Sequence, residues 1–397
     1  MRSTFTATRF SFLAAAALSS AACGGAQPAT SGDVACVETP AVPPSAATTP
    51  AGPDAKATSP NTKDGPVTPP RLEGPPQLVQ KLLAATTCEL DAGFLDQGCP
   101  SLAAWMEHDF TDADFVRATV PMLLTLLDTD DEKAHQVAGA TFAIISCDEA
   151  IDAAVAARLI AATRKPFHSL VLSALGVCLA EVPVEQHGLS AEFGALVSHP
   201  SVSLREAIVG SRFPASQSPW AYEQRLRFLG DESVKVQQEA LRTLGVWKPT
   251  PALCALLRDH LPKTDHLRGA AQAAAASSTC PGLRDEAVTS MSKHLAEAKL
   301  YGNEFGDDFA NAVGSICRSK DTPPPLKKKA FTIAKTLTDE KVSGTNVRRT
   351  ATRQLAICDP VAAKPVLQSL AKDKLQEIRD QASQQLTALD KPTPKAP

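Results

Sequence analysis

The feature that most constrains this sequence is a set of apolar residues, spaced four apart, that recurs along most of its length. Residues four apart lie on one face of an α-helix, so each set predicts a helix with one buried side. The first residues of successive sets, termed anchors below, are 31 to 42 residues apart, and a period that varies around 35 is typical of solenoids built from helix pairs. The anchors are Ala134, Phe167, Leu204, Val236, Leu267, Phe309, Val347 and Ile378.

A second series of helices is expected between the anchored ones, at residues 115–127, 148–163, 219–230, 250–260 and 360–371. Pro219, Pro251 and Pro360 suit the first turn of a helix, and Asp114 and Asp148 suit a cap or a first turn. Aromatic residues make up only 5% of the chain, and no segment alternates β-branched residues with period two, so strands are not expected. The predicted fold class is all-α, an α-solenoid of antiparallel helix pairs; an irregular helical bundle is the alternative, which eight anchors in one spacing band disfavour.

Two of the anchored segments resemble the second helix of a HEAT repeat, TNVRRTATRQLA and QEIRDQASQQLTAL. The matching residues are Val347, Arg348, Ala351 and Leu355, then Ile378, Arg379, Ala382 and Leu386. Leu204 with Arg205 and Leu267 with Arg268 repeat the apolar-Arg pair, and Asp231 stands where the family often has a turn Asp. Gln237 replaces the Arg, and the units at Ala134, Phe167 and Phe309 lack it. The resemblance implies HEAT-like helical repeats over residues 111–390, and it bears on fold far more than on function.

The first 22 residues have the layout of a secretory signal. Arg2 and Arg9 precede a short apolar stretch from Phe10 to Leu18, and small residues lead into Cys23. The run Ser-Ala-Ala-Cys at 20–23 resembles the bacterial lipobox, with Ser20 where Leu is usual. This resemblance implies cleavage after residue 22 and lipidation of Cys23, hence an exported, membrane-anchored lipoprotein facing the periplasm or the cell surface. An ordinary cleaved signal without a lipid is the alternative.

Three further segments differ from the repeats in composition. Residues 23–76 are dominated by Pro, Ala, Thr, Ser and Gly from Gly24 onward, which predicts a disordered linker. Residues 77–110 do not follow the anchor spacing and are expected to form an N-terminal cap, and residues 391–397 are expected to be a disordered tail. After the signal, no segment has the roughly 20 apolar residues that a membrane-spanning helix needs.

Eight cysteines lie in the region expected to fold, an even number that suits four disulfides in an exported protein. Because only neighbouring repeats of a solenoid touch, sequential pairing is the simplest of the connectivities. Buried free thiols are the alternative. The predicted pairs are Cys88 with Cys99, Cys147 with Cys178, Cys254 with Cys280, and Cys317 with Cys358.

The sequence contains none of the motifs that carry nucleotide, hydrolase or zinc-protease chemistry, namely GxxxxGK[ST], GxGxxG after a strand, GxSxG and HExxH. Its eight histidines are scattered, without the spacing of paired metal ligands on a helix. We therefore expect no enzyme activity, no metal and no cofactor.

Three local clusters are interpreted as structural. The acids Asp128, Asp130, Asp131 and Glu132 lack the Gly and distal Glu of a calcium loop and suit a turn before a helix N-terminus. Lys327 to Lys329 with Arg348 and Arg349 could form a basic strip, but a solvated helix face is favoured and nucleic acid is not expected as a partner. The tryptophans Trp105, Trp220 and Trp247 are expected to pack in the interior or the cap.

The sequence therefore predicts a lipid-anchored, non-enzymatic scaffold of the cell envelope that binds a protein partner through its repeat surface. An enzyme of the HEAT-like lyase or hydrolase kind is the alternative, and a purely load-bearing envelope protein is a third hypothesis. Neither the partner nor the membrane follows from the residues.

Overall fold

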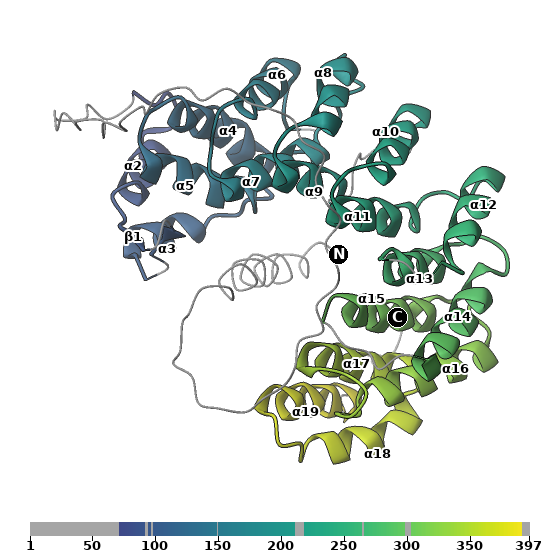
Figure 1. Ribbon diagram of the computed structural model, residues 1–397. Coiled ribbons are helices and arrows are strands. Elements are labelled where there is room, and N and C mark those ends of the chain that lie inside the picture. The colour runs from purple at the N-terminus through teal and green to yellow at the C-terminus, as the bar shows by residue number, and fades with distance from the viewer. Residues whose placement is uncertain are drawn as a thin grey trace, which may run out of the picture. The chain divides into compact units, whose positions relative to one another are not determined.

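Helix pairs follow one another along the chain in the computed structural model, which describes residues 71–91, 94–96, 98–148, 150–210, 218–263, 266–297 and 303–390 (Figure 1). Residues from Leu72 onward form one compact unit. The predicted signal at 1–22, Cys23, most of the linker and the tail at 391–397 lie outside the described residues. The linker was expected to end at residue 76, but Leu72 is already buried in the core and the first described helix begins at Pro76.

Several first helices of the pairs begin at a capping side chain or at a proline. Asp112 caps α4 by accepting hydrogen bonds from Asp114 and Phe115, and Pro219, Pro251 and Pro360 open their helices as predicted. Asp148 does not cap α6: the carboxylate of Asp152 accepts the N–H of Val155 at 2.8 Å, so the helix starts later than predicted. The first helices are α4 (Ala113–Leu127), α6 (Ala153–Ala162), α8 (Ser190–Gly194) continued by the 3-10 turn η1 (Ala195–Ser198), α10 (Pro219–Leu229), α12 (Pro251–His260), α14 (Leu283–Glu297), α16 (Pro324–Leu337) and α18 (Pro360–Leu370).

The second helix of each pair begins near an anchor, which confirms the repeat predicted from the sequence. Seven of the eight anchors are buried, and Phe167, just before its helix, packs against the core. The second helices are α5 (Glu132–Phe142), α7 (Ser169–Glu181), α9 (Val202–Gly210), α11 (Val234–Leu244), α13 (Arg268–Ser277), α15 (Asn303–Arg318), α17 (Thr345–Cys358) and α19 (Gln376–Asp390).

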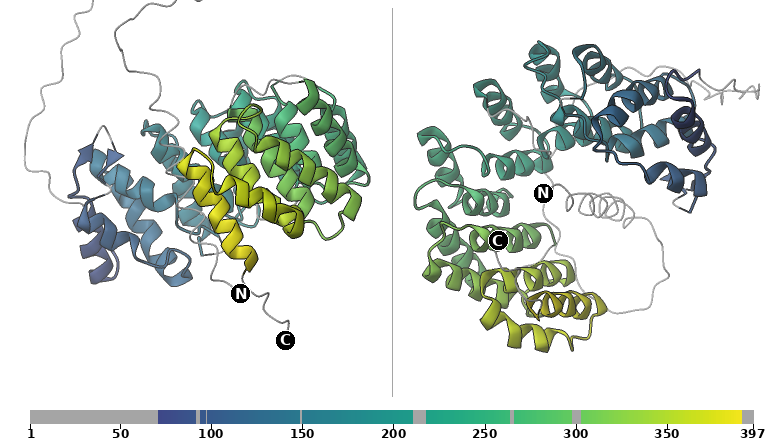
Figure 2. Two further views of the ribbon diagram at one scale, coloured as in Figure 1. Left: turned by 90° about the horizontal axis from the view of Figure 1, so that it is seen from below. Right: turned by 180° about the vertical axis from the view of Figure 1, so that it is seen from behind.

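Successive second helices pack directly on one another, from α5 through to α19, whereas most first helices pack on a neighbouring second helix. Figure 2 shows the pairs stacked side by side in two further views. Small residues allow the close approach: a Cβ added to Gly245, at the end of α11, would collide with the backbone of Ala274 in α13. The described part of the chain is thus a helical solenoid, the fold class predicted.

Before the first pair lies a cap made of α2 (Pro76–Ala85), two short strands β1 (Leu90–Asp91) and β2 (Phe94–Leu95), and α3 (Pro100–Met106). The strands pair antiparallel, Leu90 opposite Leu95, in a hairpin that the sequence did not predict because two-residue strands leave no alternating pattern. Trp105 is fully buried and its Nε1 donates to Thr141 Oγ1 of α5 at 2.9 Å. The cap therefore packs on the first helix pair.

Four disulfides join the cysteines in the sequential order predicted: Cys88 to Cys99, Cys147 to Cys178, Cys254 to Cys280, and Cys317 to Cys358. The first closes the cap, and the third ties a first helix to the residues that follow its partner. The second and fourth tie one repeat to the next. Such a set indicates an oxidising environment of the kind met by exported proteins. No described helix is long and apolar enough to cross a bilayer.

The buried apolar residues form two clusters that meet at α10 and α11. Val236 and Ala240 of α11 belong to the first cluster, whereas Leu241 and Leu244 belong to the second. Arg225 of α10 is buried at this meeting, where its guanidinium donates to Val209 O of α9 and to Thr243 Oγ1 of α11. The solenoid is continuous in its helices but not in its apolar core.

Candidate functional site

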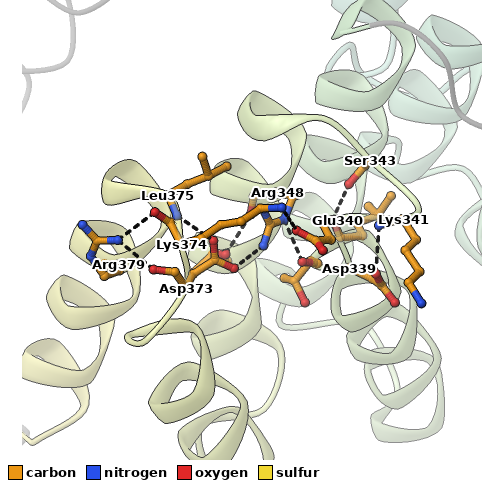
Figure 3. A network of polar contacts seen from close by, with 12 residues as sticks. Asp339, Glu340, Lys341, Ser343, Arg348, Asp373, Lys374, Leu375 and Arg379 are labelled. Carbon is orange, nitrogen blue, oxygen red and sulfur yellow. Dashed lines mark hydrogen bonds and ion pairs between the residues drawn. The ribbon is translucent and has the colours of Figure 1, made fainter.

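The polar groups of the repeats fall into two kinds, and the first kind builds the turns within each pair. Figure 3 shows an example around Arg348 of α17, which is 3% exposed. Its Nε donates to Thr338 O at 2.9 Å and its Nη2 pairs with Asp373, in the turn before α19. Asp373 also accepts the N–H of Leu375 at 3.0 Å. Arg348 therefore joins neighbouring turns and does not contribute to a basic surface strip.

The same arrangement occurs in the middle of the chain. Arg205 of α9 pairs through Nε with Asp231 at 2.7 Å, and both side chains are about 95% buried. Asp231 accepts the N–H of Ser233 at 2.7 Å, as Asp373 accepts that of Leu375. Asp231, the turn Asp of the HEAT-like pattern, is thus the partner of Arg205 in the preceding repeat.

The residue after the anchor also has a shared role. In four repeats its side chain bonds to the carbonyl oxygen six residues earlier, which closes the turn between the two helices of the pair. Arg, Gln and His can all supply this bond, which explains why the sequence pattern tolerates Gln237. The residues are His135, Arg205, Gln237 and Arg379.

The turn network shifts the pKa of Asp373. Burial by itself would raise this pKa, but the hydrogen bonds from the Leu375 N–H and from Arg348 outweigh it and hold the pKa below its usual value. The carboxylate is therefore kept ionised as part of the fold.

The second kind of polar group lies on the side of the second helices opposite the anchors. Helical geometry puts residues two, six and nine positions after each anchor on this side, which we term the outer face. From α9 onward its described members are Glu206 and Gly210 of α9; Gln238, Arg242 and Gly245 of α11 and its end; Gly269, Ala273 and Ala276 of α13; Asn311, Ser315 and Arg318 of α15; Arg349, Arg353 and Ala356 of α17; and Asp380, Gln384 and Thr387 of α19.

An ion-pair set crosses the outer face at α13. Arg242 of α11 pairs with Glu239 of its own helix, and its Nη2 lies 2.7 Å from Asp308 of α15. Because packed helices are about 8–10 Å apart, side chains from α11 and α15 can meet only if α13 between them presents small residues. Its segment RGAAQAAAAS does so, and the side chain of Asp308 is only 14% exposed.

Burial and crowding raise the pKa of both carboxyl groups in this set. Burial is the main cause for Glu239; Arg242 opposes it, while Asp308 and Glu206 raise the pKa further by repulsion. Burial likewise raises the pKa of Asp308 against the opposing effect of Arg242. Largely buried carboxyl groups with a raised pKa are a feature of functional sites as well as of structural networks.

The acidic run at residues 128–132 and the three tryptophans have structural roles. Asp128 ends α4 and pairs with Lys165, and Asp131 caps α5, so the acidic run is a turn as predicted. Trp105 and Trp247 are buried, and Trp220, half-buried, contacts Phe193. Among the described residues no group of three or more His, Cys, Asp or Glu side chains is placed to hold a metal ion.

A cavity of about 420 Å³ opens between the turn before α14 and the turn before α16. Its walls include Pro281, Pro323 and Pro325 together with Asp285 and Lys329. Lys329 Nζ lies 3.6 Å from Asp285 Oδ1. The charges of Asp285 and Lys329 offset each other. The residues that line the cavity do not include a nucleophilic side chain paired with a base. The outer face is therefore the better candidate for function.

Comparisons with known proteins yield distant structural similarity alone. No protein-family model and no curated protein sequence matches the chain. Similar solved structures include an engineered protein, with 16% identity, a TM-score of 0.29, and coverage of 73% of this chain and 87% of that one. Another is a designed armadillo repeat protein, with 16% identity, a TM-score of 0.15, and coverage of 79% and 99% respectively.

Proposed function

We propose that this chain is a lipid-anchored, non-enzymatic scaffold of the bacterial cell envelope that binds a protein partner through the outer face of its second helices. One observation carries the proposal: the outer face holds charged groups that the turns do not use. Arg242 of this face pairs with Glu239 of its own helix and with Asp308 of α15, and Arg318, Arg349 and Arg353 follow on α15 and α17. Solenoids present one strip of surface per repeat, so these groups form parts of one extended contact area.

The anchoring part of the proposal depends on the lipobox-like sequence at 20–23 and agrees with the oxidising environment that four disulfides indicate. Mass spectrometry of the protein extracted from membranes tests it directly. We expect a diacylglyceryl or triacylated Cys23 as the first residue. An unmodified Cys23 in the membrane-extracted protein would contradict anchoring.

Site-specific photo-crosslinking in living cells tests the partner-binding part. A photoreactive residue at Gln238 or Ala356 samples the outer face, whereas one at Glu223 or Lys328 samples the exposed side of the first helices α10 and α16. We expect a discrete protein adduct from the outer-face positions and none from the two controls. Equal adducts from all four positions, or none from the outer face, would contradict the proposal.

A further inference from the structure

Three arginines on the outer face have no carboxylate partner among the residues that the structure describes. Arg318 of α15 and Arg353 of α17 lie on neighbouring second helices, and Arg349 lies one turn before Arg353. All three are exposed, and among the described residues none forms an ion pair. Arg318 Nη1 donates to Gln354 Oε1 at 3.2 Å, and Arg353 Nη2 lies 3.5 Å from Asn311 Oδ1.

The neutral partners hold Arg318 and Arg353 without offsetting their charge. Gln354 is fully buried, its Nε2 has no hydrogen-bond partner, and its side chain packs so closely on Gly314 that a Cβ there would collide with it. Arg318 is therefore oriented by a fixed amide. Burial lowers the pKa of Arg318, and the positive charge of Arg353 lowers it further, so the two guanidinium groups repel each other.

Three other arginines of the second helices differ in this respect. Arg205, Arg242 and Arg348 each have a carboxylate within the fold, supplied by Asp231, by Asp308 and by Asp373. The repulsion between Arg318 and Arg353 is unfavourable for the folded state. Because both side chains are at the surface, the packing of the helices does not require two arginines here. An external anion would remove that repulsion.

We infer that Arg318, Arg349 and Arg353 bind an extended acidic segment of the protein partner, through its Asp or Glu side chains. The inference rests on the proposed function and specifies the chemistry of the partner. A guanidinium group can bind a carboxylate through two parallel hydrogen bonds, which favours acidic side chains as ligands. Side chains two residues apart in an extended strand are about 6.6 Å apart on one face, close to the spacing of residues four apart on a helix. The expected ligand therefore carries acids at alternate positions.

The test measures binding of a fluorescent peptide of alternating Glu and Ser to the full-length protein by fluorescence anisotropy, at low salt and at 150 mM salt. A peptide with Gln in place of Glu is the matched ligand control. We expect the Glu peptide to bind and the Gln peptide not to, with affinity falling as salt rises because the contact is between surface charges. The double variant Arg349→Ala with Arg353→Ala should bind the Glu peptide at least about tenfold more weakly, as expected for the loss of hydrogen bonds between charged groups.

A second double variant removes the same charge elsewhere: Lys327→Ala with Lys328→Ala on α16. Circular dichroism melting of both variants checks that the fold is kept. The inference is overturned if the Glu and Gln peptides bind equally, if both double variants weaken binding to the same extent, or if the Glu peptide does not bind. Equal competition by inorganic phosphate would also overturn it, because the site would then select charge and not an acidic segment.

The outcome is separable from that of the proposed function. A partner crosslinked at Gln238, together with no binding of the Glu peptide, would refute the acidic-segment inference and leave the scaffold proposal standing. Binding of the Glu peptide without any crosslinked partner would contradict the scaffold proposal and leave the preference of the arginines for acidic segments standing.

Discussion

The junctions between repeats are of two kinds, since some are tied by a disulfide, whereas the one in the middle, like the last one at Arg348 and Asp373, is tied by a buried ion pair. Near the ends, disulfides tie one repeat to the next: Cys147 to Cys178 between the pairs of α5 and α7, and Cys317 to Cys358 between α15 and α17. In the middle, α9 and α11 are linked by the buried ion pair of Arg205 and Asp231. The two apolar clusters also meet here.

The difference concerns how each junction responds to its surroundings. A disulfide chiefly constrains the unfolded chain and does not depend on the charge state of its neighbours. A buried ion pair stabilises only while both partners are present and charged, because a single buried charge is strongly unfavourable. The junctions with a buried ion pair should therefore be the more sensitive to single substitutions, and the junctions with a disulfide to reduction.

The largest effect is expected from Arg205→Ala, which leaves Asp231 buried without its partner. We expect a loss of about 3–5 kcal/mol in the free energy of unfolding, measured by urea denaturation. The matched control is Arg117→Ala, because Arg117 and Asp114 are 57% and 89% exposed and such pairs contribute about 0–1 kcal/mol. A loss below about 1 kcal/mol for Arg205→Ala would show that the middle junction does not depend on its ion pair.

The next effect concerns the covalent junctions. Replacing Cys147 and Cys178 together by Ala should lower the free energy of unfolding by about 2–4 kcal/mol, because the bridge closes a long loop in the unfolded chain. The bridge between Cys88 and Cys99 offers a comparison, because its cysteines are 11 residues apart, whereas Cys147 and Cys178 are 31 residues apart. On the chain-entropy account the longer loop should contribute about 1 kcal/mol more. A larger loss from the shorter bridge would mean that strain or packing outweighs loop entropy.

A smaller effect is expected where α11 meets α13. Gly245→Ala should destabilise by about 1–3 kcal/mol, since its methyl group would force the two helices apart. Gly230→Ala is the control, because a Cβ there meets only Arg227 O, at 3.5 Å. Hydrogen exchange can locate the change, and faster exchange in α11 and α13 is the expected result. Unchanged exchange in both helices after Gly245→Ala would contradict close packing at this junction.

The smallest effect is a difference in pH dependence between the two networks. The pKa of Asp373 is lowered in the fold, so its stabilisation is complete above the ordinary Asp value of 3.8 and is lost as pH falls through the lower folded value. The pKa of Glu239 is raised, so stability falls as pH rises from the ordinary Glu value of 4.5 through the higher folded value. The free energy of unfolding can be measured by urea denaturation between pH 3 and pH 7. We expect it to fall less on acidification in Asp373→Asn than in the wild type, and to fall less on raising the pH in Glu239→Gln. The same pH profile for wild type and both variants would contradict these assignments.

Local features of the repeats could be predicted from the sequence because they depend on residues close in the chain. The anchors mark a buried helix side every 31 to 42 residues, and Pro219, Pro251 and Pro360 mark helix starts. Sequential disulfides follow from the rule that only neighbouring repeats touch. Where two local signals competed the prediction was wrong, as for Asp148, which was displaced as a cap by Asp152.

The candidate site could not be predicted because it joins residues distant in the sequence. Arg348 and Arg349 are adjacent and chemically identical, yet Arg348 is buried against Asp373 and Arg349 is exposed. A rotation of 100° per residue around the helix axis separates their roles, and only the packing of α17 decides which one faces the turn. The favoured prediction of a solvated helix face therefore holds for Arg349 and is wrong for Arg348.

The sequence by itself determined the helix pairs, their register and the disulfide order, since periodicity and loop closure act along the chain. The tertiary structure alone decided which charges are neutralised. Arg242 and Asp308 are 66 residues apart and meet only because α13 between them is nearly all Ala and Gly. Arg318 and Arg353 are brought together by the packing of α15 on α17, and within the described part of the chain neither pairs with a carboxylate. Electrostatic interactions depend on distance in space, and that distance is set by the stacking of repeats.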